Sequence, residues 1–174
     1  MADLAYRAMM FAREVHAGQV RKYTGNPYAD HLAEVAGIVS TVTAKAYEAV
    51  SADEVLAVAW LHDAFEDQGI TPDELDARFG RIVAAGVVWL SDIETGNRAE
   101  RKAASRARLA RAPGWVQTIK CADIISNTSS IVKHDPKFAV TYLAEKRALL
   151  DVMDKADPRL RVLACQQSTG ENHG

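Results

Sequence analysis

Residues 62–67 read His-Asp-Ala-Phe-Glu-Asp, a string in which four of six side chains can bind a metal ion or transfer a proton. In a continuous α-helix, residues four positions apart share one face, so the string predicts two adjacent polar columns: His62 over Glu66 and Asp63 over Asp67. The segment before it, residues 55–61, is almost wholly apolar, which predicts that the helix reaches the site from the core. Buried carboxylates need a compensating charge, which a cation can supply.

Two further residues, His31 and Asp123, could complete a metal site with His62 and Asp63. This set of two imidazoles and two carboxylates favours a divalent ion that keeps water ligands over tetrahedral zinc, and we expect one manganese ion per chain. A ligated water is easier to deprotonate, and the ion offsets charge on a phosphate oxygen. On spacing alone, a hydrogen-bonded structural His-Asp couple explains the pair at 62–63 as well.

Glu66 and Asp67 would lie near the end of the predicted helix. Negative charges at a helix C-terminus oppose the helix dipole by up to ~1 kcal/mol each. We therefore interpret the two acids as functional and not as a solvated acidic cluster.

The elements that must position these residues are helices. Apolar residues recur at three- and four-residue intervals from Leu4 until Gly18, and again after His31. Two capping patterns predict helix starts, Ser51 with Glu54 and Thr71 before Pro72. No strand-like alternation occurs. We therefore expect an all-α, single-domain bundle of about seven to nine helices over residues 1–167, followed by a polar tail at 168–174.

The second half of the chain predicts a short helix at 82–90, a long helix through 116–131 and another over 137–156, with only a short turn after Pro158. A basic stretch at 98–108 is most simply a solvated helix face. If it binds phosphate, the members that would do so are Arg98, Arg101 and Lys102.

Composition narrows the function classes. The chain has 174 residues, 25% charged residues and a net charge of −2, which argues against nucleic-acid or membrane partners. No apolar run approaches the ~20 residues of a membrane span, and the N-terminus lacks signal-peptide order. Cys121 and Cys165 stand apart, as expected of core thiols in a reducing compartment. We expect a cytoplasmic protein.

Four ordered blocks resemble the HD-domain phosphohydrolases, and among them the hydrolase domain of RelA/SpoT-type proteins and the free-standing small alarmone hydrolases. The blocks are residues 16–22, 26–31, 61–67 and 120–127. The resemblance implies an HD-type helical fold and manganese-dependent removal of the 3′-pyrophosphate from guanosine tetra- and pentaphosphate (ppGpp and pppGpp).

The resemblance also implies roles for individual residues. It assigns the metal to His31, His62, Asp63 and Asp123, and the attacking water to Glu66 and Asp67. It places Arg21 and Lys22 at the substrate phosphates or base, and Asn127 and Tyr142 in the nucleotide pocket. Tyr28 and Tyr142 could be either core residues or aromatic surfaces of that pocket.

Two alternatives stay open. The chain could hydrolyse another nucleotide, such as the ribose phosphate of a dinucleotide, or it could bind a nucleotide as a sensor without turnover. Loss of a ligand or of the acidic pair would mark a sensor, and neither is lost here. In the resembling family an Arg commonly follows the Asn of the last block by two positions, whereas Ser129 stands here, so one expected phosphate or ribose contact is missing or relocated.

Overall fold

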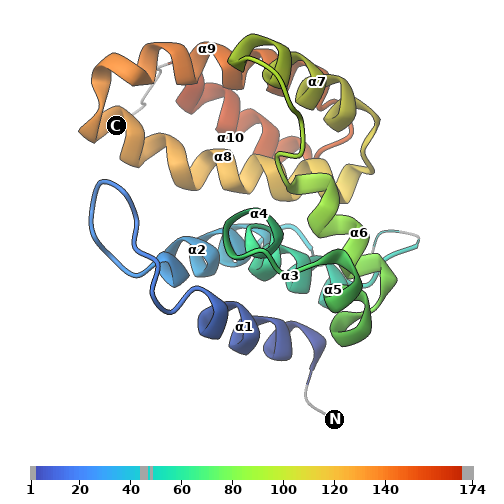
Figure 1. The fold of residues 1–174 in the computed structure, drawn as a ribbon. Coiled ribbons are helices and arrows are strands. Elements are labelled where there is room, and N and C mark those ends of the chain that lie inside the picture. The colour runs from blue at the N-terminus through green and yellow to red at the C-terminus, as the bar shows by residue number, and fades with distance from the viewer. Residues whose placement is uncertain (1–2, 44–46, 48, 170–174) are drawn as a thin grey trace. The chain divides into compact units, whose positions relative to one another are not determined.

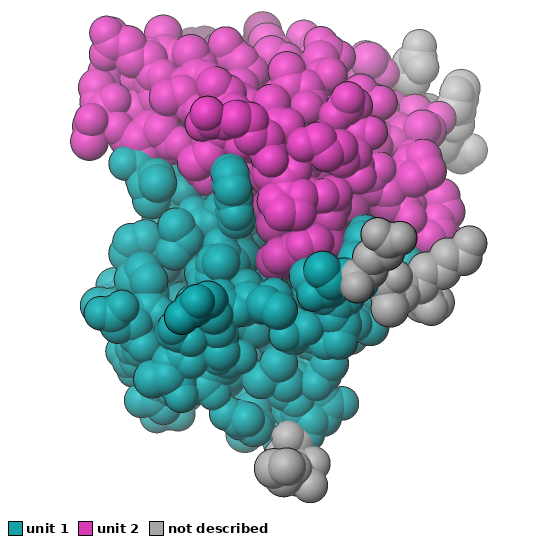
Figure 2. Space-filling view, turned by 90° about the vertical axis from the view of Figure 1, so that its right-hand side faces the viewer, with its two compact units in different colours: residues 1–93 teal, residues 94–174 magenta. Residues whose placement is uncertain are grey.

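The computed structural model describes residues 3–43, 47 and 49–169, and these ranges contain ten helices and two isolated β-bridges (Figure 1). The predicted all-α fold is confirmed. The chain divides into two compact units, residues 1–93 and 94–174, each described here by itself (Figure 2). None of the described helices combines the length and the apolar character that crossing a membrane requires.

The first unit is built around one apolar helix. Its helices are α1 (Leu4–Val15), α2 (Tyr28–Ser40), α3 (Ala52–Leu61), α4 (Ala64–Gln68), α5 (Pro72–Phe79) and α6 (Arg81–Leu90). α3 packs against α1, α2 and α6, so it is covered on several sides. Val55, Val58 and Leu61 of α3 are fully buried. This explains why residues 55–61 are almost continuously apolar, since a helix buried all round has no polar face.

Side-chain caps fix where these helices begin. Ser51 and Glu54 form the predicted capping box of α3, each side chain bonding the other residue's backbone N–H. Thr71 accepts a hydrogen bond from the Glu74 N–H, with a proline at the first position of α5. The carboxylate of Asp53 accepts bonds from the first two N–H groups of α1, at 2.9 and 3.0 Å, and so ties α1 to the start of α3.

The acidic string is not one continuous helix, and that prediction is wrong. α3 ends at Leu61, and α4 begins at Ala64 with Asp63 as its N-cap. The His62 ring nitrogen Nδ1 lies 2.8 Å from the carbonyl oxygen of Ala59, so the side chain bonds the last turn of α3 and ends it. The string is therefore divided between the C-cap of α3 and the helix α4, although the Asp67 N–H still bonds the Asp63 carbonyl at 2.9 Å, as in a helical turn.

The second unit comprises α7 (Arg98–Arg111), α8 (Gly114–His134), α9 (Pro136–Val152) and α10 (Pro158–Thr169). α8 packs against α9 and α10, and α7 packs against α9. The long helix predicted through 116–131 is confirmed. Cys121 is buried in it, and burial raises the pKa of its thiol to about 12.

The prediction of a short turn after Pro158 is wrong, because α10 is a helix of 12 residues. Its buried residues, Leu160, Ala164 and Ser168, recur every fourth position and form a narrow stripe. Ser168, the first residue of the predicted tail, is thus part of the packed helix. Residues 170–174 lie outside the described residues.

A buried amide anchors the start of α8. Gln117 is fully buried, donates to the carbonyl of Leu109 at 2.9 Å and accepts from the N–H of Lys155 at 2.9 Å. Gly114 lies against the same segment, where an added Cβ would sit 2.5 Å from the Lys155 carbonyl oxygen. The last turn of α7 and the segment after α9 are therefore joined to the first turn of the helix that carries Asp123.

Candidate metal centre and its surroundings

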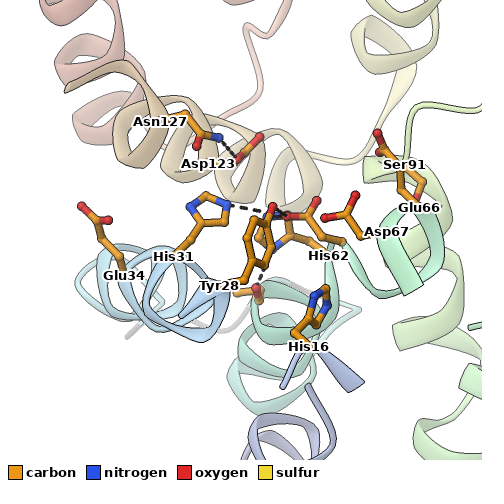
Figure 3. A network of polar contacts seen from close by, with 12 residues as sticks. His16, Tyr28, His31, Glu34, His62, Glu66, Asp67, Ser91, Asp123 and Asn127 are labelled. Atoms are coloured by element: carbon orange, nitrogen blue, oxygen red, sulfur yellow. Dashed lines mark hydrogen bonds and ion pairs between the residues drawn. The ribbon is translucent and has the colours of Figure 1, made fainter. Parts of the chain in front are cut away.

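Three predicted metal ligands come together in the first unit. His31 lies on α2, His62 follows α3, and Asp63 caps α4, and their ligand atoms all lie within 4.8 Å of one another. The two histidines are 1% and 2% exposed. Asp63 Oδ2 lies 3.0 Å from His62 Nε2 and 3.6 Å from His31 Nε2. Figure 3 shows the two rings directed toward a common region beside Tyr28.

The protonation of His62 follows from its neighbours. The Ala59 carbonyl can only accept, so Nδ1 carries the proton and donates to it. In the neutral ring, Nε2 then presents a lone pair to a carboxylate oxygen that also only accepts. A second proton on the ring, or a cation bound by both atoms, makes this contact favourable. The donor set and its arrangement therefore fit a divalent ion.

Tyr28 holds the third ligand in place. Its hydroxyl donates to Asp63 Oδ2 at 2.6 Å, and its ring stacks on His16 with centroids 5.2 Å apart. The sequence did not predict this bond, because the two residues are 35 positions apart. Its role in a nucleotide pocket stays a prediction.

The acidic pair occupies the third and fourth positions of α4, a helix of only five residues. In so short a helix these positions belong to both ends, so the argument from an opposing helix dipole does not hold. Glu66 Oε2 accepts from the backbone N–H of Asp92 at 2.9 Å. Asp67 Oδ2 accepts from the Gln19 side-chain amide at 2.8 Å. Both residues are exposed, and these hydrogen bonds orient their carboxylates.

The predicted basic pair precedes α2. Arg21 lies 3.6 Å from Glu34 on α2, the helix that carries His31. The Lys22 ammonium is exposed and lies 5.0 Å from the centroid of the Tyr23 ring. The Arg21 N–H bonds the carbonyl of Asn26, so a short loop presents both cations.

Asp123 and Asn127 belong to the second unit, on α8. Asp123 is 8% exposed and accepts from Lys120 Nζ at 2.8 Å and from Asn127 Nδ2 at 2.7 Å. The spacing of three and four residues places all three on one helix face (Figure 3 shows the Asn127 contact). The lysine keeps this carboxylate compensated, a contact that the sequence analysis did not predict.

Tyr142 of α9 is buried, and burial raises the pKa of its phenol, so it is neutral at ordinary pH. The Lys146 ammonium lies 5.1 Å from its ring centroid.

The basic stretch on α7 has structural partners in its own unit. Arg98 pairs with Glu145 at 2.7 Å, and this hydrogen bond lowers the pKa of the carboxyl. Arg108 pairs with Glu94 at 2.6 Å with both side chains largely buried. Arg98 and Arg108 thus have carboxylate partners within their own unit, which argues against a phosphate site at these two residues. Phosphate binding by Arg101 and Lys102 stays a prediction.

Comparison with known proteins identifies relatives over most of the chain. The family model of the HD domain matches residues 8–114. The guanosine-3′,5′-bis(diphosphate) 3′-pyrophosphohydrolase MESH1 of Xenopus tropicalis is 33% identical over 141 residues, covering 78% of this chain and 74% of the relative. Human MESH1 is 32% identical over 129 residues, covering 73% and 69%.

Other relatives are much longer. A probable guanosine-3′,5′-bis(diphosphate) 3′-pyrophosphohydrolase of Synechocystis is 31% identical over 141 residues, but the chain spans only 17% of its length. The chain likewise spans only 13% of the guanosine-3′,5′-bis(diphosphate) 3′-pyrophosphohydrolase of Vibrio cholerae.

Among solved structures, a metazoan ortholog of SpoT described as hydrolysing ppGpp aligns with a TM-score of 0.85 at 21% identity, covering 99% of this chain and 97% of that chain. The Listeria monocytogenes protein lmo0812 aligns with a TM-score of 0.68 at 22% identity, covering 86% and 98%. At these identities the likeness shows the fold.

Proposed function

The chain belongs to the HD-domain family, and from this membership we propose that it is a metal-dependent hydrolase that removes the 3′-pyrophosphate from guanosine tetra- and pentaphosphate. The observation that carries the proposal is the convergence of His31, His62 and Asp63 at the end of a core helix. Relatives that share about a third of their residues with the chain bear the name of this activity.

The metal ligands in this proposal are His31, His62, Asp63 and Asp123, and the ion is manganese, one per chain. The nitrogen and oxygen donors suit an ion that keeps open water positions. When bound, such an ion makes a coordinated water more acidic and offsets charge on the phosphate. Lys120 and Asn127 already donate hydrogen bonds to Asp123 and would keep its carboxylate oriented.

The proposal extends to the acidic pair, the Glu66 and Asp67 carboxylates on α4. These two carboxylates orient the attacking water, and one of them accepts its proton. Water adds to the phosphorus next to the ribose, the bond from that phosphorus to the 3′-oxygen breaks, and the 3′-oxygen takes up a proton. The products are pyrophosphate and guanosine 5′-di- or triphosphate.

The same proposal gives the substrate contacts that the family resemblance implies. Arg21 and Lys22 would bind phosphate oxygens, and Tyr28, Asn127 and Tyr142 would contact the nucleoside. Charge-assisted hydrogen bonds from such cations are about twice as strong as neutral ones, which suits a substrate with two diphosphate groups.

A nucleotide panel with product analysis tests the proposal. Guanosine tetraphosphate should yield pyrophosphate and GDP with manganese and nothing with chelator. Release of inorganic phosphate from a dinucleotide ribose phosphate, with the alarmones intact, would instead indicate the broader phosphohydrolase.

Isosteric variants separate a hydrolase from a sensor. Glu66→Gln and Asp67→Asn should keep metal content and nucleotide affinity but lower turnover by about a hundredfold or more, if proton transfer is their role. A parent protein that binds the nucleotide without turnover would identify a sensor.

A further inference from the structure

A chain of side-chain hydrogen bonds leads from the acidic pair into the core of the first unit. Gln19 Nε2 lies 2.8 Å from Asp67 Oδ2, and Gln19 Oε1 lies 2.6 Å from both Gln68 Nε2 and His16 Nδ1. Gln19 lies in the loop after α1, Asp67 and Gln68 are the last two residues of α4, and His16 is the C-cap of α1. Figure 3 shows His16 and Asp67 at the two ends of this region.

The chemistry of the neighbours determines which way each group donates. A carboxylate only accepts, so the Gln19 amide nitrogen must face Asp67 and its oxygen must face away. That oxygen receives an N–H from Gln68, and at 2.6 Å it also requires a proton on His16 Nδ1. The His16 imidazole is therefore held as the tautomer protonated at Nδ1. If the Gln19 amide were reversed, its oxygen would face the Asp67 carboxylate oxygen and its NH₂ group would face the NH₂ group of Gln68, and both contacts would be unfavourable.

The backbone of Gln19 is fixed as firmly as its side chain. Its N–H donates to the His16 carbonyl at 3.0 Å, and its own carbonyl accepts from the Tyr28 N–H at 2.9 Å. His16 is 1% exposed, and its ring stacks on that of Tyr28. Asp67, by contrast, is exposed and would otherwise sample several rotamers. In this series of hydrogen bonds, the buried His16 and the fixed backbone of Gln19 thus orient the exposed carboxylate of Asp67.

We propose that Gln19 is a positioning residue for Asp67, holding the carboxylate in the orientation from which it acts on the attacking water. His16 and Gln68 act through Gln19 by fixing the direction of its amide. This inference rests on the proposed function, because it assigns Gln19 a part in that reaction. Misplacing a reacting group by about 1 Å can cost on the order of a hundredfold in rate.

Two substitutions of Gln19 test whether its N–H donor, and not the size of its side chain, is needed. Gln19→Met keeps the length of the side chain but removes the donor, and should lower kcat on guanosine tetraphosphate about ten- to a hundredfold with KM within about twofold. Gln19→Glu replaces the donor with a second carboxylate beside Asp67, so its kcat should fall at least as far. Gln166→Met makes the matched change on the exposed side of α10 and should leave kcat at the parental value.

A double-mutant cycle shows whether Gln19 acts through Asp67. In an Asp67→Asn background, adding Gln19→Met should reduce kcat by no more than about twofold, because the positioned group is already lost. A fully additive loss in that background would overturn the proposal. Parental kcat in Gln19→Met would overturn it as well. So would a loss of kcat in Gln19→Met that is accompanied by a lower Tm and a changed KM, because that pattern indicates a general structural defect.

A spectroscopic readout does not depend on turnover. The side-chain amide signals of Gln19 in a ¹⁵N spectrum should shift in Asp67→Asn, while those of Gln166 should not. Unshifted Gln19 signals would show that the contact is absent in solution and would overturn the proposal. If the contact is present but the parent hydrolyses no guanosine 3′-diphosphate, the proposed function fails and the positioning role falls with it. If the parent is active and Gln19→Met matches it, only the positioning role fails.

Discussion

One oxygen of Asp63 is the point on which the candidate metal centre converges. Oδ2 receives the Tyr28 hydroxyl at 2.6 Å and lies 3.0 Å from His62 Nε2. A phenol that donates to a ligand oxygen fixes the direction of its remaining lone pair, so the tyrosine acts on any bound ion through the carboxylate.

Removing this phenol should therefore weaken metal binding more than it weakens the fold. Tyr28→Phe is expected to lower manganese affinity about ten- to a hundredfold, the usual effect of losing a partner behind a metal ligand. Isothermal titration measures the affinity, and thermal unfolding without metal should change little. Tyr6→Phe, an equal change on an exposed part of α1, is the control. Equal manganese affinities in the two variants would show that the Tyr28 phenol does not support the metal ligand.

At the scale of the helices, the most restrictive contact is at the start of α8. Gly114→Ala would place a methyl group 2.5 Å from a backbone oxygen that cannot rotate away. We expect a loss of about 1–3 kcal/mol in the free energy of unfolding, measured with denaturant. Gly37→Ala, on the exposed side of α2 with nothing within 4 Å, should instead stabilise by about 0.5–1 kcal/mol. Equal effects would mean that the close approach is relieved by a backbone shift.

Helix starts were predictable because their signals are local. Ser51 with Glu54 and Thr71 before Pro72 lie within one turn of the groups they cap, and both predictions are confirmed. The break after Leu61 was missed because it depends on where the His62 ring bonds, which periodicity does not encode. α10 was missed because its buried residues form a stripe only one residue wide, while the apolar Val162 and Leu163 are exposed, so its apolar residues do not follow one helical face.

The residue types of the candidate site were predictable, but their partners were not. The sequence analysis singled out His31, His62 and Asp63, and the structure places them together. The bonds from Tyr28 to Asp63 and from Gln19 to Asp67 span 35 and 48 positions, and such separations leave no repeating pattern. Residue types in the sequence therefore indicate which side chains can bind a metal, whereas the hydrogen bonds that orient those side chains appear only in the structure.

For the whole molecule, the metal should act as a stabilising ligand. An ion that binds only the folded chain stabilises it by mass action, about 2.7 kcal/mol at a concentration of 100 Kd. Adding manganese to chelated protein should raise the Tm by several degrees, and chelator should reverse this. His62→Ala should abolish the response, with Gln166→Met as the control. A Tm that manganese leaves unchanged would contradict the proposed ligand set.

Acid should destabilise the second unit. Hydrogen bonds from Arg98 and Arg159 lower the pKa of Glu145 and Asp157, so both carboxylates bind protons less readily when folded. Their stabilising contribution is fully present above the unfolded pKa values, 4.5 and 3.8, and is lost as the pH falls through the lower folded values. Each pair is partly exposed, so we expect about 0.2–1 kcal/mol apiece. Denaturant unfolding from pH 6 to pH 2 measures the loss, which Arg98→Met should reduce.

The hydrogen bonds that orient Glu66 and Asp67 differ in how easily a mutation can remove them. Glu66 is held by the main-chain N–H of residue 92, and every amino acid except proline supplies that donor. Asp67 is held by the side chain of Gln19, so a single codon change can remove its donor. Random mutation should therefore erode the orientation of Asp67 long before that of Glu66. In a lineage that loses the proposed activity, we expect position 19 to change first, while Glu66 and Asp67 are still present.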